Sequence, residues 1–257
     1  QAIVVNYVVA FTLGMFTANS FGQIHKIANK PWLKCEMILG LLFVSVFFLM
    51  AKTSQENGVS VASIAGKMSV VLPIIFGVIL YSESITFLKV IGILIALVAV
   101  YLSSVKEKKS TVKTSLLLPV LLFFGSGVID TTLKYVEINF VPVDKVDFFS
   151  GSLFGFAGIF GITILIIKKI ITNEKFELKS IVAGIALGIP NYYSIVFLIK
   201  ALQNKNFESS TLFTVNNVGI VVVSTFIGLL LFKEDFSTKN KIGVGLAILG
   251  IILVTIA

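Results

Sequence analysis

Two charged side chains lie inside long apolar stretches of this 257-residue sequence. Lys67 lies about two helical turns inside one stretch, and Asp130 lies well inside another, between Ile129 and Thr131. A lysine or aspartate at the centre of a membrane helix costs about 2.5–3.5 kcal/mol, so such a residue marks a candidate functional site. Two alternatives stay open. Lys67 can snorkel to the lipid headgroups, and Asp130 can form a structural pair with Lys134.

Uncharged polar residues in other apolar stretches can complete a binding site with these charges. An internal repeat, described below, places Asn216 and Asn217 opposite the segment that precedes Lys67. Pro190 removes a backbone hydrogen bond and can kink its helix, which would turn the next three residues toward the interior. The sequence therefore predicts a polar cavity lined by Lys67, Asp130, Asn216, Asn217, Asn191, Tyr192, Tyr193 and Asn6. The alternative is that the uncharged members are ordinary hydrogen-bonding partners between membrane helices.

The predicted cavity has a definite binding chemistry. An accessible Lys67 suits a carboxylate or phosphate, whereas Asp130 suits an amine. Together with Tyr192 and Tyr193 the two charges suit a zwitterion such as an amino acid. We therefore expect the partners to be a small-molecule solute and the lipid bilayer.

Enzyme chemistry lacks its usual constellations in this sequence. Ser126 is flanked by glycines as a nucleophile can be, but such a serine needs a histidine base, and His25 follows the first apolar stretch in a loop. Asp130 is the only aspartate deep in an apolar stretch, so no aspartyl dyad is present. Asp144 and Asp147 form one acidic pair that we assign to a loop. We predict that the protein is not an enzyme and uses no cofactor or metal.

Nine apolar stretches must position these residues. Hydrophobic residues make up 56% of the chain, charged residues only 13%, and the mean hydropathy is +1.01. Because about 20 residues of helix cross a bilayer, the sequence predicts an all-α polytopic membrane helix bundle. The nine predicted spans cover residues 2–20, 33–51, 60–82, 86–104, 114–136, 146–167, 180–200, 211–232 and 240–257. Glycines four apart, at 151 and 155 and at 184 and 188, predict close contacts between helices.

The basic residues of this chain are all lysines, and they lie mostly between the predicted spans. Their excess gives a net charge of +8. In a soluble protein this excess would suggest nucleic acid, but here it indicates loops that face lipid headgroups, and we expect no nucleic-acid partner. The sequence has a single cysteine, Cys35, so no disulfide can form within the chain.

An internal repeat divides the chain. At a constant offset of 151 residues, Glu83 matches Glu234, and Gly92 matches Gly243, each glycine nine residues after its glutamate. We predict a first repeat over residues 1–105, a charged linker over 106–113 and a second repeat over 114–257. The first repeat then has four spans and the second has five, so we expect a ten-helix fold with its first helix missing. Repeats of five helices enter the membrane from opposite sides, which makes them inverted repeats.

These features resemble the EamA-type carriers of the drug/metabolite transporter superfamily. The resemblance is clearest at Val70 to Glu83 and Val221 to Glu234, where an apolar helix ends in glutamate and a glycine-opened helix follows. Pro73 fits the family's proline in that helix, whereas Ser224 departs from the pattern. The resemblance implies ten helices in two five-helix repeats and transport of small metabolites, commonly export, without ATP hydrolysis. It implies no particular substrate.

We expect a secondary active transporter that exports a small polar metabolite, amino acid or drug-like solute by alternating access, located in the bacterial inner membrane. The alternative is a non-transporting membrane scaffold or subunit. Membrane orientation receives two opposite predictions. Loops after even-numbered spans, with the nearby helix ends, hold 12 lysines against 8 for odd-numbered spans, which places the linker over 106–113 in the cytoplasm. The family resemblance implies a cytoplasmic C-terminus and the linker outside, and we favour that orientation.

Overall fold

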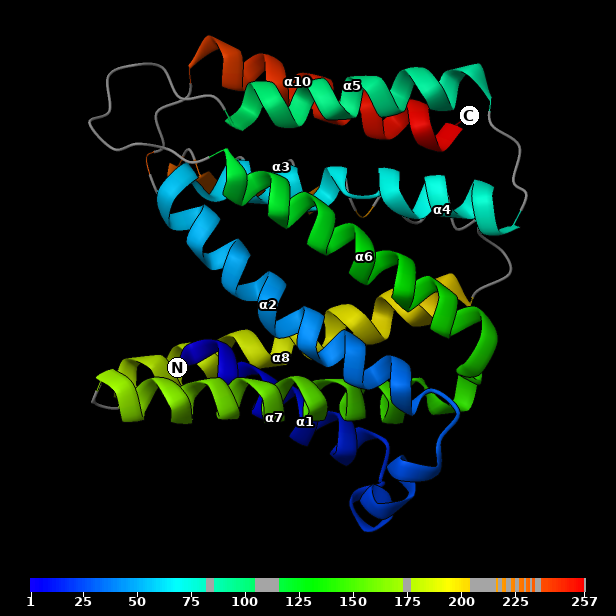
Figure 1. Ribbon diagram of the computed structural model, residues 1–257, viewed down its shortest axis with the longest axis vertical. Coiled ribbons are helices and arrows are strands. Elements are labelled where there is room, and N and C mark those ends of the chain that lie inside the picture. Colours follow the sequence, from blue (N-terminus) through cyan, green and yellow to red (C-terminus); the bar gives the residue numbers. More distant parts are fainter. Residues whose placement is uncertain are drawn as a thin grey trace. The chain divides into compact units, whose positions relative to one another are not determined.

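A computed structural model gives the three-dimensional structure of the chain (Figure 1). It describes residues 1–81, 86–104, 116–172, 177–203, 216, 219, 220, 223, 224, 227, 228, 230, 231, 233 and 237–256. Over this part of the chain all regular secondary structure is helical, which confirms the all-α prediction. The elements are α1 (Ala2–Thr17), η1 (Phe21–Asn29), α2 (Leu33–Asn57), α3 (Val59–Met68), α4 (Val71–Tyr81), α5 (Phe87–Ser104), α6 (Leu117–Phe140), η2 (Val143–Lys145), α7 (Val146–Thr172), α8 (Leu178–Leu202) and α10 (Thr238–Ile256).

Four described helices are long and apolar enough to cross a membrane. They cover Leu33–Asn57, Leu117–Phe140, Val143–Ile171 and Leu178–Leu202. A fifth candidate is α1 together with η1, which are bent by 101° at the turn between them. Asn19 in that turn has a left-handed φ of 47°, a conformation that asparagine adopts more readily than most residues. The total of nine spans and the inverted repeat stay predictions.

The predicted span over residues 60–82 is divided in the structure. Instead of one helix, α3 ends at Met68 and α4 begins at Val71. Pro73 explains the position of the break, because proline has no N–H to donate to the carbonyl four residues earlier and its ring collides with that carbonyl. That carbonyl belongs to Ser69, and it accepts the N–H of Leu72 instead, at 2.9 Å. The break therefore follows from one residue, and it lies two residues after Lys67.

The chain separates into two compact units. Unit 1 contains residues Gln1–Phe47 and Thr132–Lys205, and unit 2 contains Phe48–Thr131 and Asn206–Ala257. This division differs from the predicted halves at residues 1–105 and 114–257, because each unit takes segments from both sides of the linker. The linker over 106–113 itself, Asn217, Glu83, Glu234 and most of the predicted span over 211–232 lie outside the described residues.

In unit 1, α1 packs against both α7 and α8 through glycines. A methyl group added at Gly14 of α1 would lie 2.3 Å from the Cα of Gly151 in α7. On the other side, methyl groups at Gly184 and Gly188 of α8 would lie 2.5 Å and 2.7 Å from the Cβ atoms of valines on α1. These contacts confirm the close helix packing that the glycine spacing predicts.

In unit 2, α5 and α10 run side by side (Figure 1). The start of α10 is fixed by a reciprocal cap, in which Asn240 N donates to Ser237 Oγ at 3.2 Å and Ser237 N donates to Asn240 Oδ1 at 3.1 Å. Near the α3–α4 break, α6 approaches α4 closely. A methyl group at Gly127 would lie 2.2 Å from Cδ1 of Leu72.

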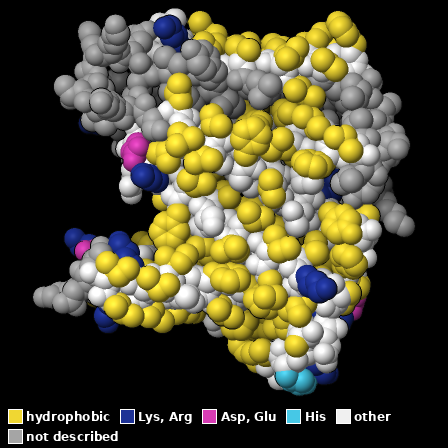
Figure 2. All heavy atoms as spheres, viewed as in Figure 1, with side chains coloured by type: hydrophobic (Ala, Val, Ile, Leu, Met, Phe, Trp, Pro, Cys, Tyr) yellow, Lys and Arg dark blue, Asp and Glu magenta, His cyan; other side chains and the backbone are white. Residues whose placement is uncertain are grey.

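The described surface is apolar where a soluble protein would be polar. Figure 2 shows hydrophobic side chains over most of the described surface in view, with charged side chains few and scattered. Large apolar side chains stand well exposed on several helices, for example Phe16 at 73% on α1 and Ile170 at 79% on α7. Contiguous apolar surface of this extent is what a lipid-facing protein presents. The chain is an integral membrane protein.

Candidate solute-binding site

The predicted site residues fall in both units. Lys67 and Asp130 lie in unit 2 together with Asn216, which is helical and exposed. Asn6, Asn191, Tyr192 and Tyr193 lie in unit 1. Three of the described predicted residues thus lie in unit 2 and four in unit 1, and each unit is described below by itself.

In unit 2, the two predicted charges meet at the α3–α4 break. Lys67 lies in the last turn of α3 and Asp130 lies on α6, and both are partly buried. They are close enough to interact electrostatically. Ser69, which is fully buried in the break, donates to the carbonyl of Gly66 at 2.5 Å, and its Oγ lies 3.4 Å from Oδ2 of Asp130. A cation, an anion and a hydroxyl thus converge where the helix backbone is interrupted.

This geometry bears on the two alternatives for Lys67 and Asp130. Asp130 faces Ser69 and Lys67 across the helix interface, so it has tertiary partners on another helix. Gly66, next to Lys67, is buried, but a methyl group there would fit at ordinary van der Waals distance, 3.7 Å from Ser126 Oγ and 3.8 Å from Met50 Cε. The glycine next to the charge pair therefore has room beside it, unlike Gly127 on α6.

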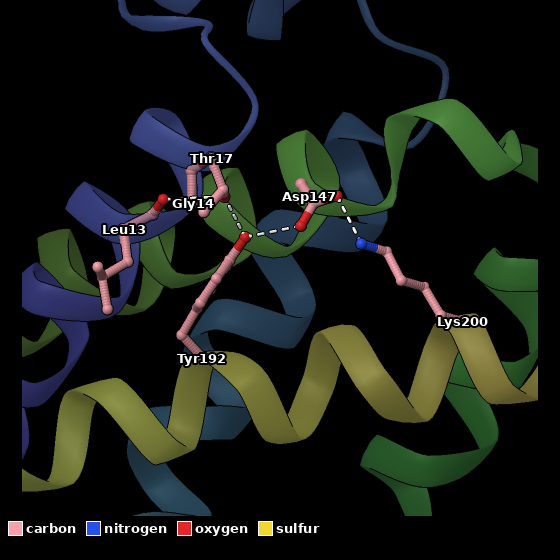
Figure 3. A network of polar contacts seen from close by, with 6 residues as sticks. All are labelled: Leu13, Gly14, Thr17, Asp147, Tyr192 and Lys200. Atoms are coloured by element: carbon pink, nitrogen blue, oxygen red, sulfur yellow. Dashed lines mark hydrogen bonds and ion pairs between the residues drawn. The ribbon is translucent and has the colours of Figure 1, made fainter.

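In unit 1, Tyr192 is the centre of a polar network that joins three helices (Figure 3). Its ring is fully buried, and its hydroxyl donates to Asp147 Oδ1 of α7 at 2.9 Å. The same hydroxyl forms a short hydrogen bond with Thr17 of α1. The other oxygen of Asp147 accepts from Lys200 Nζ at 2.8 Å.

The direction of the hydrogen bonds in this network follows from counting protons. The Tyr192 hydroxyl has one proton, which it gives to Asp147, so it accepts from Thr17. Thr17 Oγ1 also lies 2.9 Å from the carbonyl of Leu13 and 3.2 Å from that of Gly14, which are alternative acceptors for its single proton. A chain of donors therefore runs from Thr17 through Tyr192 to the Asp147 carboxylate. The same carboxylate forms an ion pair with Lys200.

A second polar contact in unit 1 joins α1 and α8. Asn191 Nδ2 donates to Asn6 Oδ1 at 3.1 Å, and Asn6 is fully buried. The amide Nδ2 of Asn6 has no hydrogen-bond partner among the described residues. Tyr193 takes another direction. It is 37% exposed and stacks on Phe197 with ring centroids 5.7 Å apart. Helix α8 continues through Pro190, so the three residues after it are distributed around the helix.

Three members of the unit 1 network were not predicted from the sequence. Nothing in the sequence around Thr17 or Lys200 indicates a role in this network, because their partners are 175 and 53 residues away in the chain. Asp147 was assigned to a loop with Asp144, but the structure places it in the first turn of α7. The signal that could have located it is the start of the apolar stretch at residue 146, since an acidic residue suits the first turn of a helix.

Comparison with known proteins agrees with a membrane transporter. Residues 2–105 match the EamA-like transporter family, which confirms over this segment the resemblance predicted from the sequence. An uncharacterized protein of Haemophilus influenzae is 28% identical over 254 residues, which cover 95% of this chain and 84% of that protein. One solved crystal structure is similar with a TM-score of 0.62 and 16% identity, over 99% of this chain and 87% of that one. The last similarity shows the fold alone.

Proposed function

We propose that this protein is a secondary active carrier that exports a small polar metabolite, amino acid or drug-like solute from bacteria by alternating access across the inner membrane. The observation that carries the proposal is the match of residues 2–105 to the EamA-like transporter family. Membrane carriers of this kind bind their solutes with polar groups near breaks in membrane helices. The interrupted segment between α3 and α4 provides such a place.

The proposed solute site in unit 2 contains Lys67 and Asp130, with Asn216 and Asn217 contributed by the second repeat. Ser69 adds a hydroxyl that the sequence did not suggest. Charges of opposite sign beside each other suit a zwitterion, whose carboxylate would bind Lys67 and whose amine would bind Asp130. Within unit 1, Asn6, Asn191, Tyr192 and Tyr193 form a second proposed group of solute-binding residues, considered by itself.

The test is transport by purified protein in liposomes with a panel of amino acids, other zwitterions and cationic drugs. In the carrier, Lys67→Met and Asp130→Asn should each lower solute exchange at least tenfold, because each removes a charge that contacts the solute. Matched controls are Lys52→Met and Asp144→Asn, since these side chains are 62% and 70% exposed and lie outside the proposed site. The controls should keep wild-type exchange.

Two outcomes would contradict the proposal. Solute exchange that persists in both Lys67→Met and Asp130→Asn would show that these two residues do not form the solute site. A folded protein that moves no member of the panel would favour the non-transporting scaffold. Monodisperse elution in detergent separates a loss of transport from a loss of folding for each variant.

A further inference from the structure

A buried glutamate in unit 1 takes no part in the networks described above. Glu36 lies in the first turn of α2, and its side chain is fully buried. Oε1 forms a short hydrogen bond with the hydroxyl of Ser152 on α7. Oε2 has no hydrogen-bond donor among the described residues. A buried polar atom without a partner is rare in native proteins and asks for a functional reason.

The surroundings of Glu36 are apolar and aromatic. Trp32, which is 2% exposed, has its indole N–H near the carboxyl group but outside hydrogen-bond geometry, so that N–H and Oε2 both stay without a hydrogen bond among the described residues. Its ring meets Phe149 edge-on at 6.1 Å. Lys30 lies in the segment before α2, and its Nζ lies over the rings of Trp32 and Phe148, 5.4 Å and 5.6 Å from their centroids. Its charge is therefore held on aromatic faces rather than in an ion pair with the carboxyl group.

Other titratable groups on the neighbouring elements are engaged elsewhere or are not basic. Tyr7 on α1 donates to the carbonyl of Phe43 at 2.9 Å. Asp147 on α7 binds Lys200 and Tyr192. Cys35 is a half-buried free thiol next to Glu36 in the chain. The ion pairs found in the described part of the chain do not include Glu36.

The contacts of Ser152 indicate which form of the carboxyl group fits. Ser152 Oγ meets Oε1 of Glu36 and also lies 2.9 Å from the carbonyl of Phe148. One hydroxyl proton cannot fully serve both acceptors. When Glu36 carries a proton, it donates to Ser152, and Ser152 donates to Phe148, so both contacts are satisfied. The start of a helix favours an anion, but this contribution is small beside the cost of burying an unpaired carboxylate.

We propose that Glu36 is a proton-binding site that couples transport to the proton gradient; this inference rests on the proposed carrier function. In the state described, the carboxyl group is neutral. In another state of the transport cycle, water reaches it, the O–H bond breaks, the proton passes to water and the carboxylate remains. The proton returns when the site closes.

The first experiment measures protonation without any solute. Infrared difference spectra of the purified full chain, recorded between acidic and alkaline pH, should contain a carbonyl band of a neutral carboxylic acid that persists at neutral pH. Glu36→Gln should remove this band. Glu56→Gln is the matched control, because it makes the same change in the same helix at a side chain that is 35% exposed and near Lys52. A band that is unchanged in Glu36→Gln would overturn the proposal.

The second experiment tests coupling in liposomes with a solute from the panel above. A pH gradient should drive accumulation by the wild type. Glu36→Gln should lose the whole gradient-driven component while keeping solute exchange at equal pH. Gradient-driven accumulation that survives in Glu36→Gln, or a wild type driven only by sodium, would overturn the proposal. Solute exchange without any response to pH would overturn the coupling alone and leave the carrier function standing.

A folding defect in Glu36→Gln has its own control. Glu36→Asp keeps a carboxyl group but shortens it by one methylene, so the contact with Ser152 must change. A shifted pH profile of exchange in Glu36→Asp supports the proposal. A profile identical to that of the wild type contradicts it.

Discussion

Tyr192 and Tyr193 are adjacent in α8 but differ in what their hydroxyl groups do. The Tyr192 hydroxyl is buried between Thr17 and Asp147, whereas Tyr193 stacks on Phe197 and is partly exposed. The first hydroxyl joins three helices. The second has no hydrogen bond within the described structure.

Removing the two hydroxyl groups should therefore have different effects on stability. We expect Tyr192→Phe to lower the free energy of unfolding by about 1–3 kcal/mol, because it removes the buried hydroxyl that donates to the charged Asp147 carboxylate. Tyr193→Phe is the matched control and should change it by less than about 0.5 kcal/mol. Denaturant unfolding in detergent, followed by circular dichroism, measures both. Equal effects would mean that the network in Figure 3 does not stabilise unit 1.

The ion pair in the same network should contribute less than the tyrosine. The side chains of Lys200 and Asp147 are 45% and 30% exposed, and ion pairs in such surroundings are worth about 0–1 kcal/mol. The order of the two contributions follows from burial, since the Tyr192 ring is fully buried and Lys200 is not.

At the scale of elements, the α3–α4 break should depend on Pro73. Pro73→Ala restores an N–H that can donate to the carbonyl of Ser69, so we expect a continuous helix and slower amide deuterium exchange over residues 69–72. Transport should fall, because Ser69 and Lys67 would take new positions. Pro119→Ala is the matched control. Pro119 lies in the first turn of α6, where its missing N–H has no partner in the helix in any case. If amide deuterium exchange over residues 69–72 is unchanged in Pro73→Ala, another feature causes the break.

The positions of α2 and α8 could be predicted from the sequence because each follows a long apolar stretch without an internal break. The predicted span over 180–200 agrees with α8 at Leu178–Leu202, and that over 33–51 agrees with α2, which continues to Asn57. Helix α2 is longer than predicted because polar residues after the apolar stretch extend the same helix. Gly58, with a φ of 106°, separates it from α3, because glycine adopts this conformation without the steric cost that a side chain would bring.

The candidate site could be predicted only in part. Lys67 and Asp130 could be found because a charge in an apolar stretch is conspicuous. The partners of Tyr192 could not, because contacts between α1, α7 and α8 depend on how the helices pack. Glu36 was overlooked for a related reason. It lies at the start of a predicted span, where a charge is unremarkable, and only the packing of Ser152 and Trp32 shows that it is buried.

At the scale of the whole molecule, the orientation in the membrane is the open prediction. The lysine distribution and the family resemblance give opposite answers, and the margin of 12 lysines against 8 is small. We expect the linker outside and Ala257 inside. After replacement of the native Cys35, a Ser110→Cys variant should react with an impermeant thiol reagent in intact cells. A lack of reaction at this position, with a tag after Ala257 accessible from outside, would reverse the orientation.

The contact between Gly14 and Gly151 limits how this protein can change by descent. The most accessible replacements of a glycine add at least a methyl group, and at Gly14 that group would lie 2.3 Å from the facing backbone. The atoms nearest to a methyl group at Gly14 belong to the main chain of Gly151, which cannot shrink in compensation. Gly14 and Gly151 can therefore be substituted only if the two helices also move apart. Substitutions during evolution should accumulate at neighbouring positions and not at these two glycines.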